Sequence, residues 1–182
     1  FAINGSMVAA VGSKYYNRAF FVEPSGDVTL YDKHHLFSLG GEARVYTPGE
    51  AESPIVRYRG CNIKMMVCYD LRFPVWSRNV ECGYDMLLYP ANWPDSRKQA
   101  WKSLLQARAI ENASYVVGAN RTGADDFGIY SDGRSYIFNN WGDRVDHPGA
   151  NGILYAELDL AQLDVDRRRF PAWRDADPFT IL

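Results

Sequence analysis

The chain changes its pattern at Cys68, and this change constrains the fold most. Before it, short segments rich in Val, Ile, Tyr and Phe alternate with turn residues, which predicts antiparallel hairpins with strands over 2–11, 16–22, 28–31, 55–58 and 63–68. After it, helix and strand patterns alternate, with helices expected over 74–82, from Pro94-Asp95-Ser96 onward and over 161–170, and strands over 86–89, 115–119, 135–138 and 152–158. The combination predicts an α/β fold.

The composition limits the classes of protein to consider. The chain has 182 residues, 47% of them hydrophobic, which is enough for one ordinary core. We see no repeat or linker and expect a single domain over 1–182. The formal net charge of -2 argues against a nucleic-acid partner. No apolar run approaches the roughly 18 to 20 residues that cross a bilayer, so we expect no membrane association.

The three cysteines, Cys61, Cys68 and Cys82, are odd in number and lack C-x-x-C spacing. This argues against a disulfide framework and a cysteine zinc site, and favours a reducing cytoplasm. No phosphate loop or dinucleotide fingerprint is present, so we expect neither a cofactor nor a metal. His34 and His35 are adjacent and would point to opposite faces of an extended chain, which makes a shared metal improbable. Structural hydrogen bonds are the better interpretation for both.

The long helix has an unusual apolar face. Asp95 or Ser96 is expected to cap it. Its buried side is then formed by Ala100, Trp101, Leu104, Leu105 and Ala107, and Arg108, Glu111 and Asn112 fall on the same side. Because an unpaired buried charge is costly, we expect Arg108 and Glu111 to form a buried ion pair that holds the helix to the sheet or to another subunit. A direct catalytic role is the alternative.

Cys68 stands where an apolar strand must turn toward a helix. A thiol at such a corner is exposed at a sheet edge, and the next backbone N–H, that of Tyr69, can point at a developing oxyanion. The alternative is that Cys68 is a small core residue, which is the commoner case for a cysteine ending a buried strand. Cys61 and Cys82 lack this context and are interpreted as structural.

Other polar residues follow strands in the same way. Lys33 comes after the strand over 28–31, although a surface lysine is the ordinary interpretation. Trp93 and Arg121 follow the strands over 86–89 and 115–119. In alternating sheets such strand ends gather into one site.

Four stretches together resemble the nitrilase superfamily, the carbon-nitrogen hydrolases, in the order that the family keeps. They are Tyr31-Asp32-Lys33-x-His35-Leu36-Phe37, Cys68-Tyr69-Asp70-x-Arg72-Phe73-Pro74, Ala91-Asn92-Trp93-Pro94 and Arg108-Ala109-x-Glu111-Asn112. The resemblance covers almost all of the chain. Among the branches of the family it is most similar to the omega-amidases, which include 2-oxoglutaramate amidase, on VCYDLRFPVWSRN, QARAIENASYVVGANR and FPAWRDADPF.

The resemblance implies a four-layer αββα sandwich that dimerises through a helical layer. It also implies a catalytic set in which Cys68 is the nucleophile, and Lys33 stabilises the tetrahedral intermediate together with the Tyr69 amide. Glu42 matches a second glutamate beside the site. Arg72, Trp93 and Arg121 are the candidates for contacts with the substrate; a cationic side chain would suit a carboxylate, and a structural ion pair is equally compatible with either arginine.

The chain departs from the family at one point. The general-base glutamate of the family lies well upstream of the lysine, and here only Glu23 precedes Lys33. We do not assign the role to Glu23. We expect the base to lie in an N-terminal segment that this sequence, which starts at Phe1, does not include, and we expect the isolated chain to be inactive and its core incomplete.

The leading hypothesis is an amidase that hydrolyses the terminal amide of a small carboxylate, such as an α-keto acid amide, to acid and ammonia through a cysteine thioester. Another amide or N-carbamoyl amino acid hydrolase of the same superfamily is the first alternative. A non-catalytic member that acts by dimerisation or binding is the second, and a redox-sensing thiol is the third.

Overall fold

A computed structural model describes residues 1–126, 128–131 and 134–181, which form two principal sheets. The first is a three-stranded antiparallel sheet of β1 (Ile3–Val11), β2 (Lys14–Val22) and β3 (Val28–Asp32). Gly12 lies in the two-residue turn between β1 and β2 at φ 59°, a conformation that glycine adopts without strain. The hairpins predicted for this part of the sequence are confirmed.

The second sheet has five strands in the order β10, β7, β6, β5, β4. They are β4 (Ile55–Tyr58), β5 (Cys61–Met65), β6 (Met86–Ala91), β7 (Tyr115–Asn120) and β10 (Tyr136–Phe138). Strands β5, β6 and β7 are parallel, and β4 and β10 are antiparallel at the two edges. The carboxyl ends of the three parallel strands therefore meet at one edge of the sheet.

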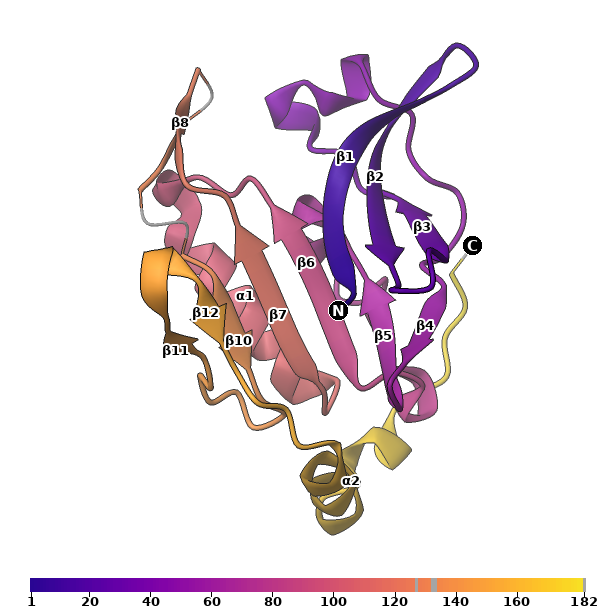
Figure 1. Ribbon diagram of the computed structural model, residues 1–182. Coiled ribbons are helices and arrows are strands. Elements are labelled where there is room, and N and C mark those ends of the chain that lie inside the picture. The colour runs from indigo at the N-terminus through magenta and orange to yellow at the C-terminus, as the bar shows by residue number, and fades with distance from the viewer. Residues whose placement is uncertain (127, 132–133, 182) are drawn as a thin grey trace.

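Two helices accompany the larger sheet. Helix α1 (Lys98–Glu111) connects β6 to β7, and α2 (Leu160–Arg169) lies at the amino ends of the parallel strands (Figure 1). The short strands are β8 (Gly123–Asp125), β9 (Gly128–Tyr130), β11 (His147–Pro148) and β12 (Leu154–Tyr155). The 3-10 helices are η1 (Ser38–Gly40), η2 (Glu42–Arg44), η3 (Cys68–Arg72), η4 (Val80–Cys82), η5 (Asp95–Arg97), η6 (Ala150–Gly152) and η7 (Ala172–Asp175).

The elements form layers, with the three-stranded sheet on one face of the larger sheet and α1 on the other (Figure 1). Phe21 and Tyr31 of the small sheet join the same apolar core as Met65 and Leu87 of the large one. On the other face, α1 packs so closely on Gly118 that a Cβ there would lie 2.4 Å from Leu105 Cδ1. The expected α/β sandwich is confirmed, and the layers described here are three of the four expected, α1 and the two sheets.

The buried face of α1 follows the sequence prediction closely. Trp101, Leu105 and Arg108 are buried, and the Arg108 guanidinium donates to Glu111 Oε1 at 2.8 Å. The expected ion pair is confirmed, although Glu111 is partly exposed. Arg108 also donates to the Leu71 carbonyl oxygen at 2.7 Å. The pair therefore fastens the helix to η3, the segment that begins at Cys68.

Replacing Arg108 by Met is expected to lower the free energy of unfolding by about 2 kcal/mol, because the Leu71 carbonyl loses its buried donor and water cannot replace it. The loss is measured by urea denaturation. Lys102→Met, on the exposed side of the same helix, is the control and should change stability by less than about 0.5 kcal/mol. Equal midpoints for the two variants would contradict the role given to Arg108.

Three local predictions are wrong. No α-helix forms over 74–82: isolated turns and η4 replace it, because the Asn79 side chain bonds Tyr84 and Asn112 instead of leaving the backbone to close a helix. The strand expected over 152–158 is reduced to β12. Neither Asp95 nor Ser96 caps α1, since η5 intervenes and Asp95 binds Ser131.

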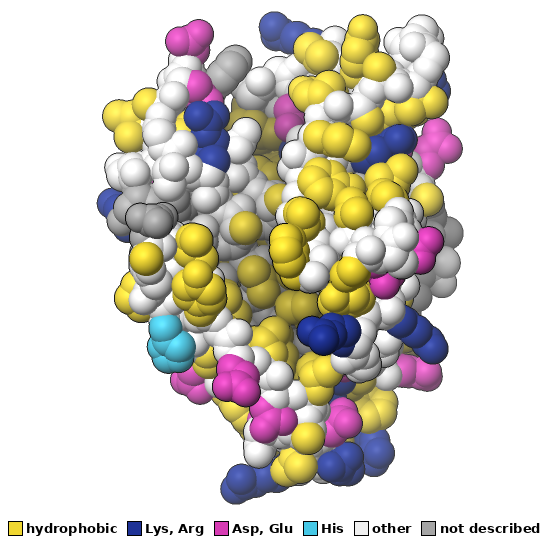
Figure 2. Space-filling view, viewed as in Figure 1, with side chains coloured by type: hydrophobic (Ala, Val, Ile, Leu, Met, Phe, Trp, Pro, Cys, Tyr) yellow, Lys and Arg dark blue, Asp and Glu magenta, His cyan; other side chains and the backbone are white. Residues whose placement is uncertain are grey.

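Several apolar side chains of β1 are exposed, namely Ile3, Met7, Val8 and Val11. Figure 2 shows apolar side chains gathered over this part of the molecule.

Of the helices in the described ranges, none has the length and apolarity needed to cross a bilayer.

Candidate active site

Cys68 lies at a sharp turn between β5 and η3. Strand β5 ends at Met65, three residues earlier than the sequence predicts. Cys68 has a φ of 44°, in the left-handed region that costs a residue with a side chain on the order of 1 kcal/mol or more. The turn presents the thiol at the carboxyl edge of the parallel strands, where its Sγ lies 3.9 Å from the Asn92 carbonyl oxygen. The expected corner position is confirmed.

Lys33 follows β3 directly and is buried, with only 1% of the residue exposed. Its backbone N–H donates to the Asn17 carbonyl, and its carbonyl accepts from Gly49 N–H. The Nζ donates to Glu42 Oε2 at 2.6 Å. A lysine that is buried and paired in this way is not the surface residue of the ordinary interpretation.

Glu42 begins η2, after a turn in which Gly41 has a φ of 79°. Besides the Lys33 ammonium, its Oε2 accepts the Phe37 backbone N–H at 2.6 Å, and its Oε1 accepts from the Asn17 side chain at 3.3 Å. The carboxylate is thus fixed by three donors from two other segments. It holds the Lys33 ammonium in one position.

Burial and Lys33 act in opposite directions on the Cys68 thiol. Burial raises the pKa of the thiol, and it is the largest influence. The positive charge of Lys33 and the Asn92 carbonyl contact lower the same pKa, while Glu42 and Asp70 raise it further. The net direction is upward. Lys33 by itself favours the thiolate, but the effect of burial on the thiol pKa is larger.

Cys68, Lys33 and Glu42 line one cavity of about 260 Å³. The opening lies between the three-stranded sheet and the carboxyl end of β6, and Figure 2 shows the molecule hollowed beside β1. The rest of its wall comes from β1 and β2, from the segments on either side of η2, from the segment over 67–72 and from the segment over 90–97 that ends β6 and leads into η5. It consists of Ser6, Met7, Val8, Asn17, Phe37, Tyr46, Val67, Tyr69, Arg72, Pro90, Ala91, Asn92, Trp93, Pro94 and Arg97. The cavity has room for a small organic molecule.

Two arginines stand in this wall beside aromatic rings. The Arg72 guanidinium lies 5.1 Å from the centre of the Trp93 ring, and that of Arg97 lies 5.1 Å from the centre of the Phe37 ring. Trp93 is buried, and its Nε1 donates to the Arg97 carbonyl oxygen at 2.9 Å. The structure therefore brings Tyr69, Arg72 and Trp93 together at the cavity, as the sequence predicts.

Arg121 is not placed with them. It pairs with Asp125 at 2.6 Å and lies 4.6 Å from the centre of the Tyr130 ring. Within the described part of the chain, the cavity wall does not include it. Arg97, which sequence reasoning missed, does line the cavity. The signal that could have found it is its place three residues after Pro94, at the same strand end as Trp93.

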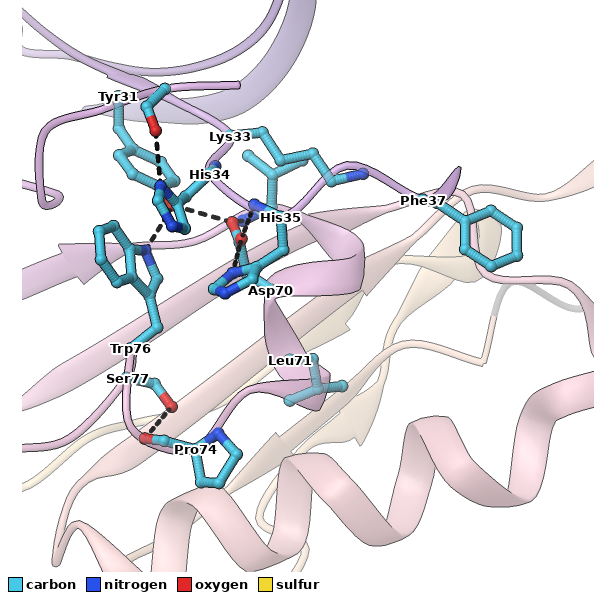
Figure 3. Close-up of polar contacts among 12 residues, drawn as sticks. Tyr31, Lys33, His34, His35, Phe37, Asp70, Leu71, Pro74, Trp76 and Ser77 are labelled. Atoms are coloured by element: carbon cyan, nitrogen blue, oxygen red, sulfur yellow. Dashed lines mark hydrogen bonds and ion pairs between the residues drawn. The ribbon is translucent and has the colours of Figure 1, made fainter. Parts of the chain in front are cut away.

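Behind Lys33, the two histidines bind structural partners. His34 Nδ1 lies 2.6 Å from the Gly49 carbonyl oxygen, and His35 Nδ1 lies 2.9 Å from Asp70 Oδ1. Their rings stack on Trp76 and Phe73. Figure 3 shows this cluster around Asp70, with the Lys33 side chain leaving it in the direction of Phe37. In the described ranges, His, Cys, Asp and Glu form no group of three that could hold a metal ion.

Comparison with known proteins gives consistent matches. Residues 2–168 match the sequence profile of the carbon-nitrogen hydrolase family. The omega-amidase YafV of Yersinia enterocolitica is 46% identical over 182 residues, which cover 99% of this chain and 70% of that protein. The 2-oxoglutaramate amidase of Bacillus subtilis (strain 168) is 34% identical over 176 residues, covering 95% and 67%. The crystal structure of XC1258 from Xanthomonas campestris, a CN-hydrolase superfamily protein with an arsenic adduct in its active site, has a TM-score of 0.92 and 36% identity, covering 100% of this chain and 71% of that one.

Proposed function

The chain belongs to the carbon-nitrogen hydrolase family, and we propose that it releases ammonia from the terminal amide of a small α-keto acid through a thioester on Cys68. The observation that carries the proposal is the cavity in which the Cys68 thiol, the Lys33 ammonium and the Glu42 carboxylate meet. The names omega-amidase and 2-oxoglutaramate amidase, given to two relatives, support the choice of substrate.

The first half of the reaction forms the thioester. The Cys68 sulfur bonds to the carbonyl carbon of the amide while its proton moves to a carboxylate. The negative charge that develops on the carbonyl oxygen is stabilised by the Lys33 ammonium and the Tyr69 backbone N–H. When the tetrahedral intermediate collapses, the carbon-nitrogen bond breaks and the nitrogen leaves as ammonia, carrying the proton that the thiol gave up.

The second half restores the enzyme. Water attacks the thioester, the carbon-sulfur bond breaks, and the acid leaves while the thiol regains a proton. Glu42 holds the Lys33 side chain in place throughout, because its Oε2 accepts a hydrogen bond from the Lys33 Nζ. Both oxygens of Glu42 already accept hydrogen bonds from other residues. We therefore assign the proton transfers to a carboxyl group other than that of Glu42, and we assign this role to none of the described residues.

The two arginines in the wall support an anionic substrate. Within the described ranges, neither Arg72 nor Arg97 forms an ion pair with a carboxylate, and both residues line the cavity that holds Cys68. A guanidinium binds a carboxylate through two parallel hydrogen bonds. We therefore assign these two residues, with Trp93 as the platform beneath Arg72, to the carboxylate end of the substrate.

A substrate panel tests the proposal. The full-length protein is offered 2-oxoglutaramate and 2-oxosuccinamate beside simple neutral amides and N-carbamoyl amino acids, and ammonia release is measured. The keto acid amides should be hydrolysed with the highest kcat/KM. Preference for an N-carbamoyl amino acid would move the protein to the other amide hydrolases of the superfamily.

The same panel applied to Arg72→Met and Arg97→Met locates the carboxylate subsite. Each change should lower kcat/KM for the keto acid amides about 10- to 100-fold, because a hydrogen bond to a charged group is lost, and should leave neutral amides within about twofold. Arg121→Met is the control, since Arg121 lies outside the cavity wall of the described structure. A uniform loss for all substrates would contradict a role in carboxylate recognition.

We also propose that two copies associate through the side that carries α1 and α2. Ile110, Trp141 and Phe170 are exposed there, and the Trp141 and Phe170 rings lie 6.2 Å apart. Sedimentation equilibrium should show a dimer that Phe170→Asp converts to a monomer, whereas Val28→Asp, at an exposed apolar position on β3, leaves it intact. A monomer at all concentrations would reject this assignment.

A further inference from the structure

One fully buried carboxylate connects the two segments that carry Lys33 and Cys68. Asp70 is 0% exposed, and each of its oxygens accepts a backbone N–H. Its Oδ1 accepts from the N–H of His35, two residues after Lys33, at 3.0 Å. Its Oδ2 accepts from the N–H of Val67, the residue before Cys68, at 3.0 Å.

Two side chains complete the coordination of this carboxylate, as Figure 3 shows. The Nδ1 of His35 lies 2.9 Å from Oδ1, and the Tyr31 hydroxyl donates to Oδ2 at 3.0 Å. The Tyr31 oxygen in turn accepts from Trp76 Nε1 at 2.9 Å. Tyr31 and His35 flank Lys33 in the chain, so Asp70 holds the lysine segment on both sides of the catalytic residue.

Asp70 also controls the turn at Cys68. Its own backbone N–H donates to the Val67 carbonyl at 3.0 Å, while its carboxylate binds the Val67 N–H. Both polar groups of Val67 are therefore held by Asp70. This counteracts the tendency of Cys68, at a φ of 44°, to relax to an ordinary conformation.

An asparagine could not make these bonds. The amide has one acceptor oxygen and one nitrogen that only donates. In one orientation the nitrogen would face the His35 N–H, and in the other it would face the Val67 N–H, so a buried donor would meet a buried donor either way. The pattern requires a carboxylate that accepts on both oxygens.

We propose that Asp70 is a positioning residue that sets the distance between the Lys33 ammonium and the Cys68 sulfur by binding the main chain of both segments at once. The inference rests on the proposed function for its effect on turnover. Its effect on the Cys68 thiol does not require turnover. Asp70 is fully buried and is not among the described residues of the cavity wall, so it acts through Lys33 and Cys68.

The test is a double-mutant cycle read on the thiol. The pKa of Cys68 is measured from the pH dependence of its alkylation by iodoacetamide, followed on the Cys68 peptide by mass spectrometry, in the wild type, Asp70→Asn, Lys33→Met and the double variant. Removing the Asp70 charge directly lowers the thiol pKa in both backgrounds. Displacement of the Lys33 ammonium from Cys68 raises the thiol pKa, and this second effect operates only in proteins that contain Lys33. The change in thiol pKa caused by Asp70→Asn should therefore be about 0.4 to 2 pH units more positive when Lys33 is present than in the Lys33→Met background.

Turnover supplies the second readout. Asp70→Asn should lower kcat on the preferred amide on the order of 100-fold, the loss expected when reacting groups are displaced by about 1 Å, and leave KM within a few-fold. The matched control is Asp85→Asn. Asp85 also binds a backbone N–H, that of Asn62, and a side chain, that of Arg167, but it lies at the opposite end of β6. It should cost stability and leave both kcat and the thiol pKa unchanged.

The outcomes separate the two proposals. Equal shifts of the thiol pKa in both backgrounds would overturn the positioning role, whatever the enzyme hydrolyses. A positive coupling with no turnover on any amide, in the wild type as well, would support the positioning role and reject the proposed function. If Asp70→Asn does not fold, Tyr31→Phe takes its place in the cycle, since it removes one donor from Oδ2 and keeps both backbone bonds. Tyr31→Phe should give a smaller coupling of the same sign. If Tyr31→Phe shows no coupling with Lys33→Met, the inference is overturned.

Discussion

Ammonia release from the preferred amide should fall to background, on the order of 10⁶-fold, when Cys68 is replaced by alanine. No other atom can form the covalent intermediate in this position, and the described structure places no second thiol in the cavity wall. The fold should persist. The Cys68 Sγ makes only a long contact with the Asn92 carbonyl, and alanine meets the same backbone strain as cysteine at a positive φ.

Cys82→Ala is the matched control for this experiment. Cys82 is half-buried and also has a positive φ, 53°, but lies in η4, outside the cavity. It should retain wild-type kcat/KM. Thermal unfolding of both variants reports the fold. Retention of more than about a hundredth of the wild-type activity by the Cys68 variant, with the protein folded, would remove the thioester mechanism.

Replacing Lys33 by Met should lower kcat about 100- to 1000-fold, the loss typical of removing one oxyanion donor. A second effect has a definite sign. Because the positive charge of Lys33 lowers the pKa of the Cys68 thiol against the effect of burial, its removal should raise that pKa further. Alkylation of Cys68 should then be slower at neutral pH, and its pH profile should move upward. Stopped-flow or mass-spectrometric alkylation rates between pH 7 and roughly 11 measure this shift.

Lys64→Met separates the charge effect from a general loss of stability. Lys64 is also buried, at 6% exposure, and its Nζ lies 3.7 Å from Glu52, away from the cavity. Methionine keeps the length of the side chain in both variants. The Lys64 variant should keep both kcat and the alkylation profile of Cys68. A Lys33 variant that behaved in the same way would show that the ammonium has no part in the reaction.

The sequence predicts best the helices and strands whose own residues show a regular pattern of apolar and polar side chains. The hairpins over β1 to β3 and the strand β4 were expected within a few residues, because alternation and turn residues act locally. The apolar face of α1 was expected for the same reason. The helix expected over 74–82 was wrong because Asn79 forms tertiary bonds with Tyr84 and Asn112 that no local pattern reports.

In the candidate site, too, some residues could be predicted from local sequence and others only from the tertiary structure. Cys68 and Lys33 were expected from their motifs and from positions at strand ends, and Glu42 from the family resemblance alone. The structure brings all three to one cavity. Arg97 was missed, and Arg121 was expected there but pairs with Asp125 instead. Both arginines follow a strand of the same sheet, so sequence position alone cannot separate them. The loop geometry after each strand decides which guanidinium faces the cavity.

The sequence by itself determined the family and indicated Cys68 and Lys33 as the candidate nucleophile and its lysine, because short local motifs carry this information. The tertiary structure alone decided that the Lys33 ammonium is buried against Glu42, that burial outweighs it at the Cys68 thiol, and that Asp70 binds the main chain on both sides. These properties depend on contacts between residues up to 35 positions apart in the sequence, and on the exclusion of water from between them. Both arise only when the two sheets pack together.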